Sequence, residues 1–145
     1  MFARTVALLA CTLLVSVHAL AEDLLDPEVA FRATATLIKP DVIEVRYQTA
    51  PGYYLYRNRL AYDLEPGAGV ARLGKPNLPA GKIKRDKFFG RQAIYRNATL
   101  VRIPVFAPAG MRLTLVADLQ GCADLGVCYP PVRRKFSLSP TQPAQ

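Results

Sequence analysis

The feature that most constrains the fold is an alternation of apolar and polar side chains that recurs along most of the chain after residue 28. In residues 112–119, for example, Leu113, Leu115, Ala117 and Leu119 share one face of an extended strand. This two-residue period is typical of half-buried β-strands, and no segment shows the 3.6-residue period of a convincing helix. Turns rich in Pro and Gly separate the alternating segments. The sequence therefore predicts seven or so strands, at residues 31–37, 42–47, 53–56, 60–64, 99–105, 112–119 and 134–138.

Short strands joined by regular turns predict an all-β chain, folded as an immunoglobulin-like antiparallel β-sandwich. The length of 145 residues suits one such domain. With 51% hydrophobic and 21% charged residues, the chain can form a packed core, which excludes a disordered protein. The chain has no Trp, so the Trp that packs against the inter-sheet disulfide of antibody domains is absent.

The first residues have the pattern of a secretory signal peptide. A basic start at Arg4 precedes an apolar run over residues 5–17, and Ala19 and Ala21 form a cleavage site before Glu22. The run is too short to span a membrane, and no later stretch approaches that length. We therefore expect a cleaved signal peptide at 1–21, one domain at 22–138, a linker-like tail at 139–145, and no direct membrane insertion of the mature chain.

Cleavage would remove Cys11 and the single His18 and leave one cysteine pair, Cys122 and Cys128. Without a histidine, neither a His-dependent catalytic dyad nor a His-ligated metal site can form. Two thiolates alone make a poor metal site, so we expect no metal. Export to an oxidising compartment favours a disulfide between the two cysteines.

The formal net charge is +8, and the basic residues gather in two clusters. One of them interleaves with Phe88 and Phe89, an arrangement that also occurs in nucleic-acid binding. Export argues against nucleic acid, and charge runs are usually solvated faces, so we expect no nucleic-acid partner. A more modest role is the steering of acidic partners. The clusters comprise Lys82, Lys84, Arg85, Lys87 and Arg91, and Arg133, Arg134 and Lys135.

Residues 121–131 contain the two cysteines and a turn-forming segment at 124–126 between them. A turn there would bring the two Cα atoms within the roughly 4.4–6.8 Å that a disulfide requires. A structural disulfide closing so small a ring would contribute about 2 to 2.5 kcal/mol. Composition and spacing alone therefore leave a structural and a redox-active disulfide equally well supported.

Three blocks of sequence resemble a known family. They are Gly121-Cys-Ala-Asp-x-Gly-x-Cys-Tyr-Pro-Pro131, Gly52-Tyr-Tyr-Leu-Tyr-Arg57, and Asp86-Lys-Phe-Phe-Gly90 followed by Ile94-Tyr-Arg96. Together they resemble, in order and spacing, the N-terminal periplasmic domain of the thiol:disulfide interchange protein DsbD. The resemblance covers nearly all of residues 28–138. It implies an immunoglobulin-like sandwich in the periplasm whose cysteine pair shuttles electrons without a cofactor, as a thiol-disulfide oxidoreductase.

The resemblance also implies roles for individual residues. Cys128 would form mixed disulfides with partners, and Cys122 would resolve them. Phe88 would be the aromatic of a cap loop that lies over the disulfide, with Asp86 and Gly90 flanking it.

The rest of the predicted site follows from the same resemblance. Tyr54 and Tyr56 would line the other side of the disulfide, although without the resemblance ordinary strand packing is the preferred explanation for tyrosines in a strand. Phe89 and Lys87 complete the predicted cap. The family often has an acidic residue at the position of Lys87, and a cation there would favour the thiolate of Cys128.

The resemblance further implies the partners of the domain. The donor would be the thioredoxin-like domain of a DsbD-type membrane transporter, and the acceptors would be periplasmic disulfide isomerases and cytochrome c maturation thioredoxins. The transporter's membrane and thioredoxin-like domains are missing here, which predicts either a fragment or a stand-alone carrier. The competing hypothesis is a non-catalytic immunoglobulin-like binding module with a structural disulfide.

Overall fold

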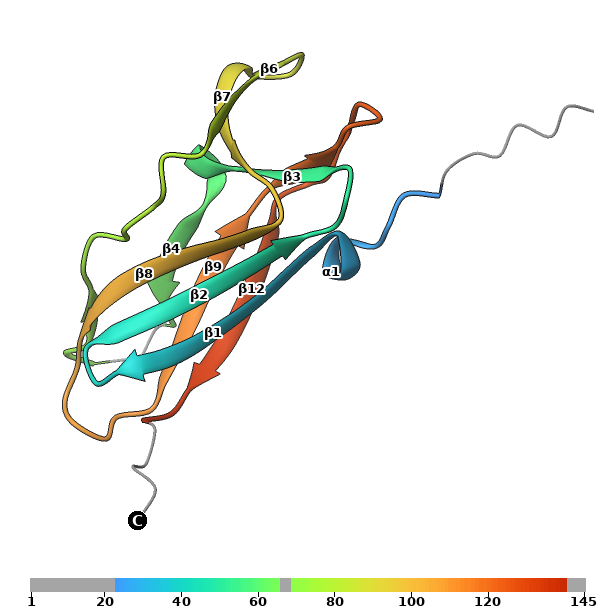
Figure 1. Cartoon of the computed structure of the whole chain (residues 1–145). Coiled ribbons are helices and arrows are strands. Elements are labelled where there is room, and N and C mark those ends of the chain that lie inside the picture. The colour runs from blue at the N-terminus through green and yellow to red at the C-terminus, as the bar shows by residue number, and fades with distance from the viewer. Residues whose placement is uncertain (1–22, 66–68, 141–145) are drawn as a thin grey trace, which may run out of the picture.

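The computed structural model describes residues 23–65 and 69–140. Every pair of strands in it is antiparallel, and Figure 1 shows two layers of strands packed face to face. The predicted immunoglobulin-like antiparallel β-sandwich is thereby confirmed. The signal peptide predicted at 1–21 and residues 141–145 of the predicted tail lie outside the described residues.

The two layers of the sandwich are a four-stranded and a three-stranded sheet. The first has the strand order β1-β2-β8-β5, and the second has the order β12-β9-β4. The strands of the first sheet are β1 (Phe31–Lys39), β2 (Val42–Thr49), β8 (Ala98–Phe106) and β5 (Arg72–Leu73). Those of the second are β12 (Val132–Leu138), β9 (Leu113–Leu119) and β4 (Ala61–Leu64).

The core lies between these layers, and the alternation in the sequence explains it. Every second residue of β8 and of β9 is buried, because successive side chains of a strand point to opposite faces. Burying one aliphatic side chain of this size contributes about 1.5–3 kcal/mol. The core side chains of these two strands include Val101, Ile103, Val105, Leu113, Leu115 and Leu119.

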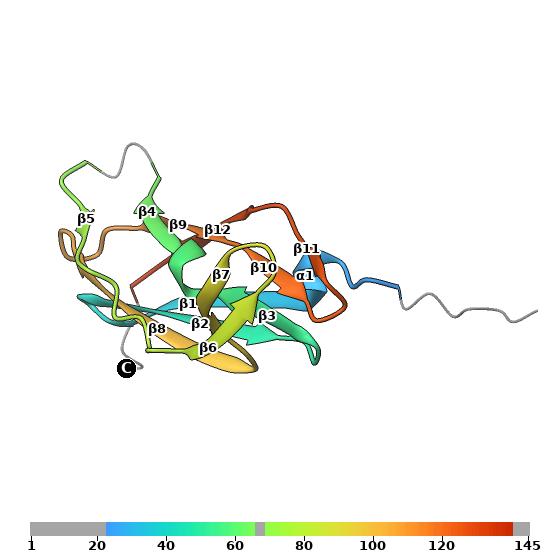
Figure 2. The ribbon, with the colours of Figure 1, turned by 90° about the horizontal axis from the view of Figure 1, so that it is seen from above.

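A third sheet extends the sandwich at one end. It has five strands in the order β11-β10-β3-β7-β6, and Figure 2 shows it from above. Its strands continue those of the layers, since only Gln120 separates β9 from β10 and two residues separate β7 from β8. Its members are β11 (Val127–Cys128), β10 (Gly121–Ala123), β3 (Tyr53–Tyr56), β7 (Gly90–Tyr95) and β6 (Lys82–Asp86).

All seven predicted strands are present, but the sequence did not reveal β5, β6, β7, β10 and β11. Strand β6 holds one apolar residue, Ile83, among charged ones, so it shows no alternation. Two short helical turns were also unforeseen, α1 (Pro27–Ala30) and the 3₁₀ turn η1 (Arg57–Arg59).

The acidic segment before α1 is held against the domain. The backbone N–H of Leu25 donates to the Tyr53 hydroxyl at 3.0 Å, and the Tyr129 hydroxyl donates to the Leu25 carbonyl at 2.5 Å. Glu28 in α1 forms an ion pair with Arg134 at 3.2 Å. The segment is therefore part of the folded domain from at least Leu25 onward.

Candidate functional site

A disulfide joins Cys122 on β10 to Cys128 on β11, directly opposite each other in register. The predicted turn at 124–126 closes this hairpin: the Gly126 N–H donates to the Ala123 carbonyl at 2.9 Å, and Gly126 has the positive φ (87°) that such a turn requires. We call residues 121–128 the cysteine hairpin. The Cα atoms are 4.0 Å apart, slightly closer than predicted, because the two cysteines face each other across adjacent strands.

The two sulfur-bearing residues differ sharply in accessibility. Cys122 is fully buried, whereas Cys128 is partly exposed. Thiol–disulfide exchange requires an attacking sulfur to reach the sulfur it attacks. An incoming macromolecule can therefore approach the pair only from the side of Cys128.

Strand β3 carries the two predicted tyrosines, and both faces of this strand are buried. Tyr53 and Leu55 belong to the sandwich core, whereas Tyr54 and Tyr56 point to the disulfide side. Period two along four consecutive residues produces this division. The small second cluster consists of Tyr54, Tyr56, Ile94 and Cys122, with Cys128 packed against it.

The Tyr56 hydroxyl lies beside both sulfurs, 3.0 Å from Sγ of Cys122 and 3.6 Å from Sγ of Cys128. Because disulfide sulfurs carry no proton, the hydroxyl is the only possible donor in these contacts. Burial raises the pKa of Tyr56, and neighbouring Asp86 and Tyr54 raise it further. The phenol therefore keeps its proton near neutral pH and cannot act as a base.

Asp86 ends β6 and is buried, with 5% of its surface exposed. Its Oδ2 accepts a hydrogen bond from the Tyr54 hydroxyl at 2.5 Å. Its Oδ1 accepts the backbone N–H groups of Phe88 at 2.7 Å and Phe89 at 3.1 Å. One carboxylate therefore fixes the turn at 87–89 and ties it to the strand that faces the disulfide.

These hydrogen bonds set the charge states of the pair. Burial alone would raise the pKa of Asp86, but the hydroxyls of Tyr54 and Tyr56, followed by the two amides, lower it overall. Burial, followed by the hydrogen bond to Asp86, raises the pKa of Tyr54 to about 12. Near neutral pH the site therefore holds a carboxylate and two neutral phenols.

Strands β6 and β7 form a second hairpin, and we call residues 82–95 the cap hairpin. Gly90 lies opposite Asp86 in register and leaves a turn of Lys87, Phe88 and Phe89 at its tip. Figure 1 shows this hairpin projecting from the same end of the sandwich as the cysteine hairpin.

The two cap phenylalanines occupy different surroundings. The Phe89 ring packs edge-on against Tyr56, with centroids 5.2 Å apart, whereas Phe88 has the Lys87 ammonium 4.9 Å from its ring. The aromatic in contact with the tyrosine beside the sulfurs is therefore Phe89. The resemblance instead assigns the cap role to Phe88, which is 48% exposed here.

Lys87 connects the two hairpins. A methyl group added at Gly126 would meet its Nζ at 2.7 Å, so the ammonium lies directly against the turn of the cysteine hairpin. The structure therefore places the Lys87 ammonium beside the turn that joins the two cysteines, and its influence on the Cys128 thiolate stays a prediction.

An ionic link that the sequence reasoning did not single out fixes the cysteine hairpin. Arg96 donates to both carboxylate oxygens of Asp124, at 2.7 and 2.9 Å, and Lys84 lies 3.9 Å from the same carboxylate. Both cations also lie over the Tyr54 ring, about 5 Å from its centroid. Arg96 and Asp124 both lie within the sequence blocks that resemble the family, and this position was the sequence feature that could have identified them.

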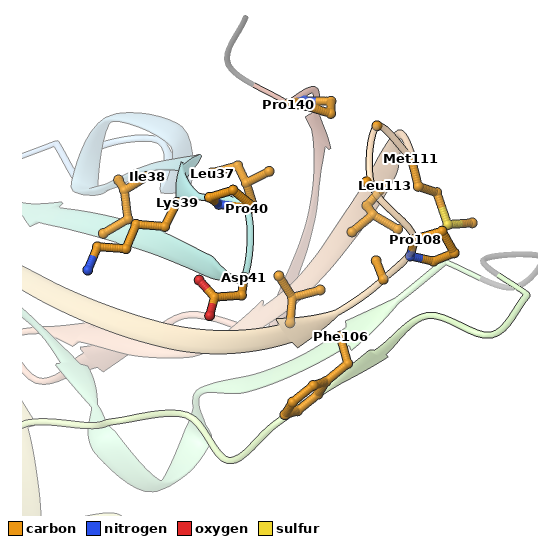
Figure 3. A pocket seen from close by; sticks show the side chains of 14 residues that line it. Leu37, Ile38, Lys39, Pro40, Asp41, Phe106, Pro108, Met111, Leu113 and Pro140 are labelled. Carbon is orange, nitrogen blue, oxygen red and sulfur yellow. The ribbon is translucent and has the colours of Figure 1, made fainter. Parts of the chain in front are cut away.

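A cavity lies at the opposite end of the sandwich. It measures about 570 Å³ and is lined mainly by apolar side chains of the β1–β2 turn and the β8–β9 loop; Figure 3 shows Leu37, Pro108 and Met111 around it. Among residues 23–65 and 69–140, no group of three or more His, Cys, Asp or Glu side chains could hold a metal ion.

A family model described as "Thiol:disulfide interchange protein DsbD, N-terminal" matches residues 21–140. The chain belongs to this family. Among curated relatives, the DsbD proteins of Neisseria meningitidis serogroup A and of Ralstonia nicotianae are each 40% identical, over 82% and 83% of this chain. The chain spans 19% of the length of each of these relatives.

Two solved structures from Neisseria meningitidis are similar to the domain. The DsbD N-terminal domain in its reduced form is 39% identical, with a TM-score of 0.72 over 83% of this chain and 93% of that one. A complex between the DsbD and PilB N-terminal domains includes a chain that is 38% identical, with a TM-score of 0.66 over 81% of this chain and 88% of that one. These matches confirm the resemblance that the three sequence blocks carry.

Proposed function

We propose that this DsbD N-terminal domain is a periplasmic thiol–disulfide exchange module. It takes reducing equivalents from the thioredoxin-like domain of a DsbD-type membrane transporter. It passes them to exported acceptors, including disulfide isomerases and cytochrome c maturation thioredoxins. Its Cys122–Cys128 pair is the only redox group required, without a bound cofactor.

The observation that carries this proposal is the unequal exposure of the two cysteines. A redox pair needs one sulfur that a partner can reach and a second that stays close to resolve the mixed disulfide. Cys128 is partly exposed at the end of the sandwich, and Cys122 is buried beneath it. A purely structural disulfide requires no such asymmetry.

The exchange conserves atoms and electrons in two steps. The Cys128 thiolate attacks one sulfur of an acceptor disulfide, forms a mixed disulfide, and releases the other acceptor sulfur as a thiolate. The Cys122 thiolate then attacks Sγ of Cys128 and releases the second acceptor thiolate. Two electrons leave the cysteine pair, which becomes the disulfide of the structure.

The surrounding residues support these steps without reacting themselves. The Tyr56 phenol lies within hydrogen-bonding distance of both sulfurs and can stabilise the thiolate that forms there. The cap hairpin, anchored by Asp86, shields the pair from small oxidants until a partner displaces it.

Among the described residues, no helix is long and apolar enough to cross a membrane.

The reduction potential of the pair tests the proposal. Redox-buffer titration of the folded protein with thiol trapping should give a value in the range of thioredoxin-like proteins, with the fold retained in both states. Structural disulfides typically lie below about −300 mV. A value in that range, or unfolding upon reduction, would identify a binding module held by a structural disulfide.

Trapping distinguishes the roles of the two cysteines. Cys122→Ala should accumulate a mixed disulfide with an oxidised thioredoxin-like protein, because the resolving sulfur is gone. The matched variant Cys128→Ala should accumulate none, because Cys122 is buried. Equal trapping by both variants would contradict the assignment of Cys128 as the attacking sulfur.

A further inference from the structure

The two hairpins beside the disulfide expose several large apolar side chains. Phe88 is 48% exposed on the cap hairpin, and Leu125 is 60% exposed on the cysteine hairpin. Exposed apolar side chains on neighbouring hairpins mark candidate surfaces for binding other proteins. The set consists of Phe88, Phe89, Leu125 and Val127. Ile83 is also exposed, but it alternates with Lys84 and Asp86, which face Tyr54, and so lies on the other face of β6.

Each cap phenylalanine carries a cation on its ring. The Arg59 guanidinium lies 4.7 Å from the centre of Phe89, and the Lys87 ammonium lies 4.9 Å from the centre of Phe88. Neither cation forms an ion pair with a carboxylate of the described residues. A partner that contacts the phenylalanines therefore also meets two uncompensated positive charges.

The carboxylates of the two hairpins offset only part of the positive charge, because two of them stand against five basic side chains, those of Lys82, Lys84, Arg85, Lys87 and Arg91. Asp86 is buried and its oxygens are occupied by the Tyr54 hydroxyl and the backbone amides of the turn. Asp124 is engaged by Arg96 from both carboxylate oxygens. Both acidic groups are therefore committed to internal contacts.

The cap hairpin also retains a pairing that is unfavourable for its own stability. Arg85 and Arg91 lie directly opposite each other in register, and both are exposed. Like charges in directly opposed positions destabilise an antiparallel pair. Together with exposed Lys82, which also lacks a carboxylate partner among the described residues, they make this end of the molecule strongly positive.

We infer that this surface docks a partner protein whose own reactive cysteines are bordered by acidic side chains. The inference rests on the proposed function and specifies the chemistry of the partner. The exposed apolar residues supply the contact, and the basic border accelerates the encounter of oppositely charged surfaces. In the relative from Neisseria meningitidis, the recorded complex is likewise with a protein domain.

Two synthetic disulfide peptides test the inference against the reduced full chain. They share one cyclic Cys-x-x-Cys segment, flanked by glutamates in the first and by lysines in the second. At low ionic strength the glutamate peptide should be reduced roughly tenfold faster than the lysine peptide. Salt should shrink this ratio toward one, because it screens the charges.

A charge reversal on the cap hairpin locates the effect. Arg85→Glu should slow reduction of the glutamate peptide about threefold or more, while the rate with an uncharged small disulfide stays unchanged. The variant replaces a like-charged cross-strand pair by an opposite-charged one, so it should not lose stability. Arg112→Glu, an equal charge change at an exposed position before β9, should leave the peptide rate unaltered.

Three outcomes would overturn the inference while leaving the proposed function intact. The first is an equal rate for both peptides at low salt, and the second is an equal loss of rate in Arg85→Glu and Arg112→Glu. The third is equal peptide rates combined with binding to phosphatidylglycerol vesicles, which would assign the basic surface to a membrane. Failure of the pair to reduce either peptide, or the small disulfide, would refute the proposed function instead.

Discussion

At one end of the sandwich the β1–β2 turn and the β8–β9 loop surround a cavity, whereas at the other end two hairpins project into solvent (Figures 1 and 3). The cavity is lined mainly by apolar side chains, with Lys39 and Asp41 as its charged members. The hairpin end holds the disulfide, the two tyrosines and the basic side chains of the cap hairpin. This cavity and the reactive group therefore lie at opposite ends of the domain.

This contrast shows how the size of a substrate shapes a site. Cavities of several hundred Å³ suit small ligands, which they surround. A sulfur that must meet a sulfur of another protein needs instead an accessible position on a projecting element. The cysteine hairpin provides such a position. Its buried residues Gly121 and Cys122 pack closely against the rest of the domain and hold the hairpin in place.

The largest expected effect tests that packing. A methyl group at Gly121 would collide with the Tyr54 carbonyl and with the Phe31 ring at 2.5 Å. Gly121→Ala should therefore lower the free energy of unfolding by about 3 kcal/mol, measured by urea denaturation. At the cavity end, Gly110 has a φ of 75° and nothing within 4 Å of an added methyl group. Gly110→Ala should lower the free energy of unfolding by only about 1 kcal/mol. Equal losses in the two variants would show that the two ends of the domain do not differ in packing.

Acidification should have the next largest effect, and at the hairpin end it acts through Asp86. The pKa of Asp86 is lowered in the fold, so its stabilising contribution is present above about pH 4 and is lost as pH falls through the folded-state value. Replacing Asp86 by Ala should remove the same contribution, about 2 kcal/mol.

Nuclear magnetic resonance can follow this titration directly. The amide protons of Phe88 and Phe89, which donate to Asp86, should shift with a midpoint below 3.8. The Met111 amide, which donates to the Pro108 carbonyl at the cavity end, should not respond. A midpoint above 3.8 would contradict the hydrogen-bonded carboxylate.

The cap phenylalanines give a smaller and more specific test. Phe89→Ala removes the ring that packs on Tyr56, and an aromatic pair contributes about 1 kcal/mol beyond its burial. Oxidation of the reduced pair by hydrogen peroxide should therefore be faster in Phe89→Ala than in Phe88→Ala. If Phe88→Ala has the larger effect, the cap role implied by the family resemblance holds instead.

The smallest effect concerns the ionic link to the cysteine hairpin. Arg96→Lys keeps the charge but loses the two-pronged contact with Asp124, and should cost about 0.5 kcal/mol because the pair is partly exposed. Arg133→Lys disrupts a similar contact between Arg133 on β12 and Asp118 on β9. Only the first variant should change the rate at which dithiothreitol reduces the disulfide. An equal change in both would mean that the link does not position the hairpin.

The sandwich layers were predictable because their strands alternate clearly. Strand β8, for instance, buries every second residue over its whole length, as its sequence indicates. The cap hairpin was not predicted as a pair of strands, because charged residues of β6 conceal any period. Strand β6 is held by its pairing with β7 and by the hydrogen bonds of the buried Asp86. These interactions form only in the folded domain, so the local sequence does not show them.

The site was predictable in its chemistry and less so in its details. The cysteine pair and its turn follow from residues 121–131 alone, and the resemblance identified Asp86, Tyr54 and Tyr56. The resemblance assigns the cap role to Phe88, whereas the structure packs the ring of Phe89 on Tyr56. The sequence pattern could not show this contact, since adjacent turn residues differ only in the direction that the backbone gives them. Arg96 also escaped notice, because its partner Asp124 is distant in sequence.

Strand β3 has a consequence for how such a domain can change over time. Its inner face belongs to the core, and its outer face holds the Tyr56 hydroxyl beside the sulfurs and the Tyr54 hydroxyl bonded to Asp86. A substitution that disturbs the chemistry from this strand would therefore also disturb the fold. The exposed charged side chains of the cap hairpin belong to neither the core nor the group around the sulfurs, so substitutions there need not disturb the fold or the chemistry. Descendants of this chain can adapt to new protein partners by altering that surface, while their electron-transfer chemistry stays inherited.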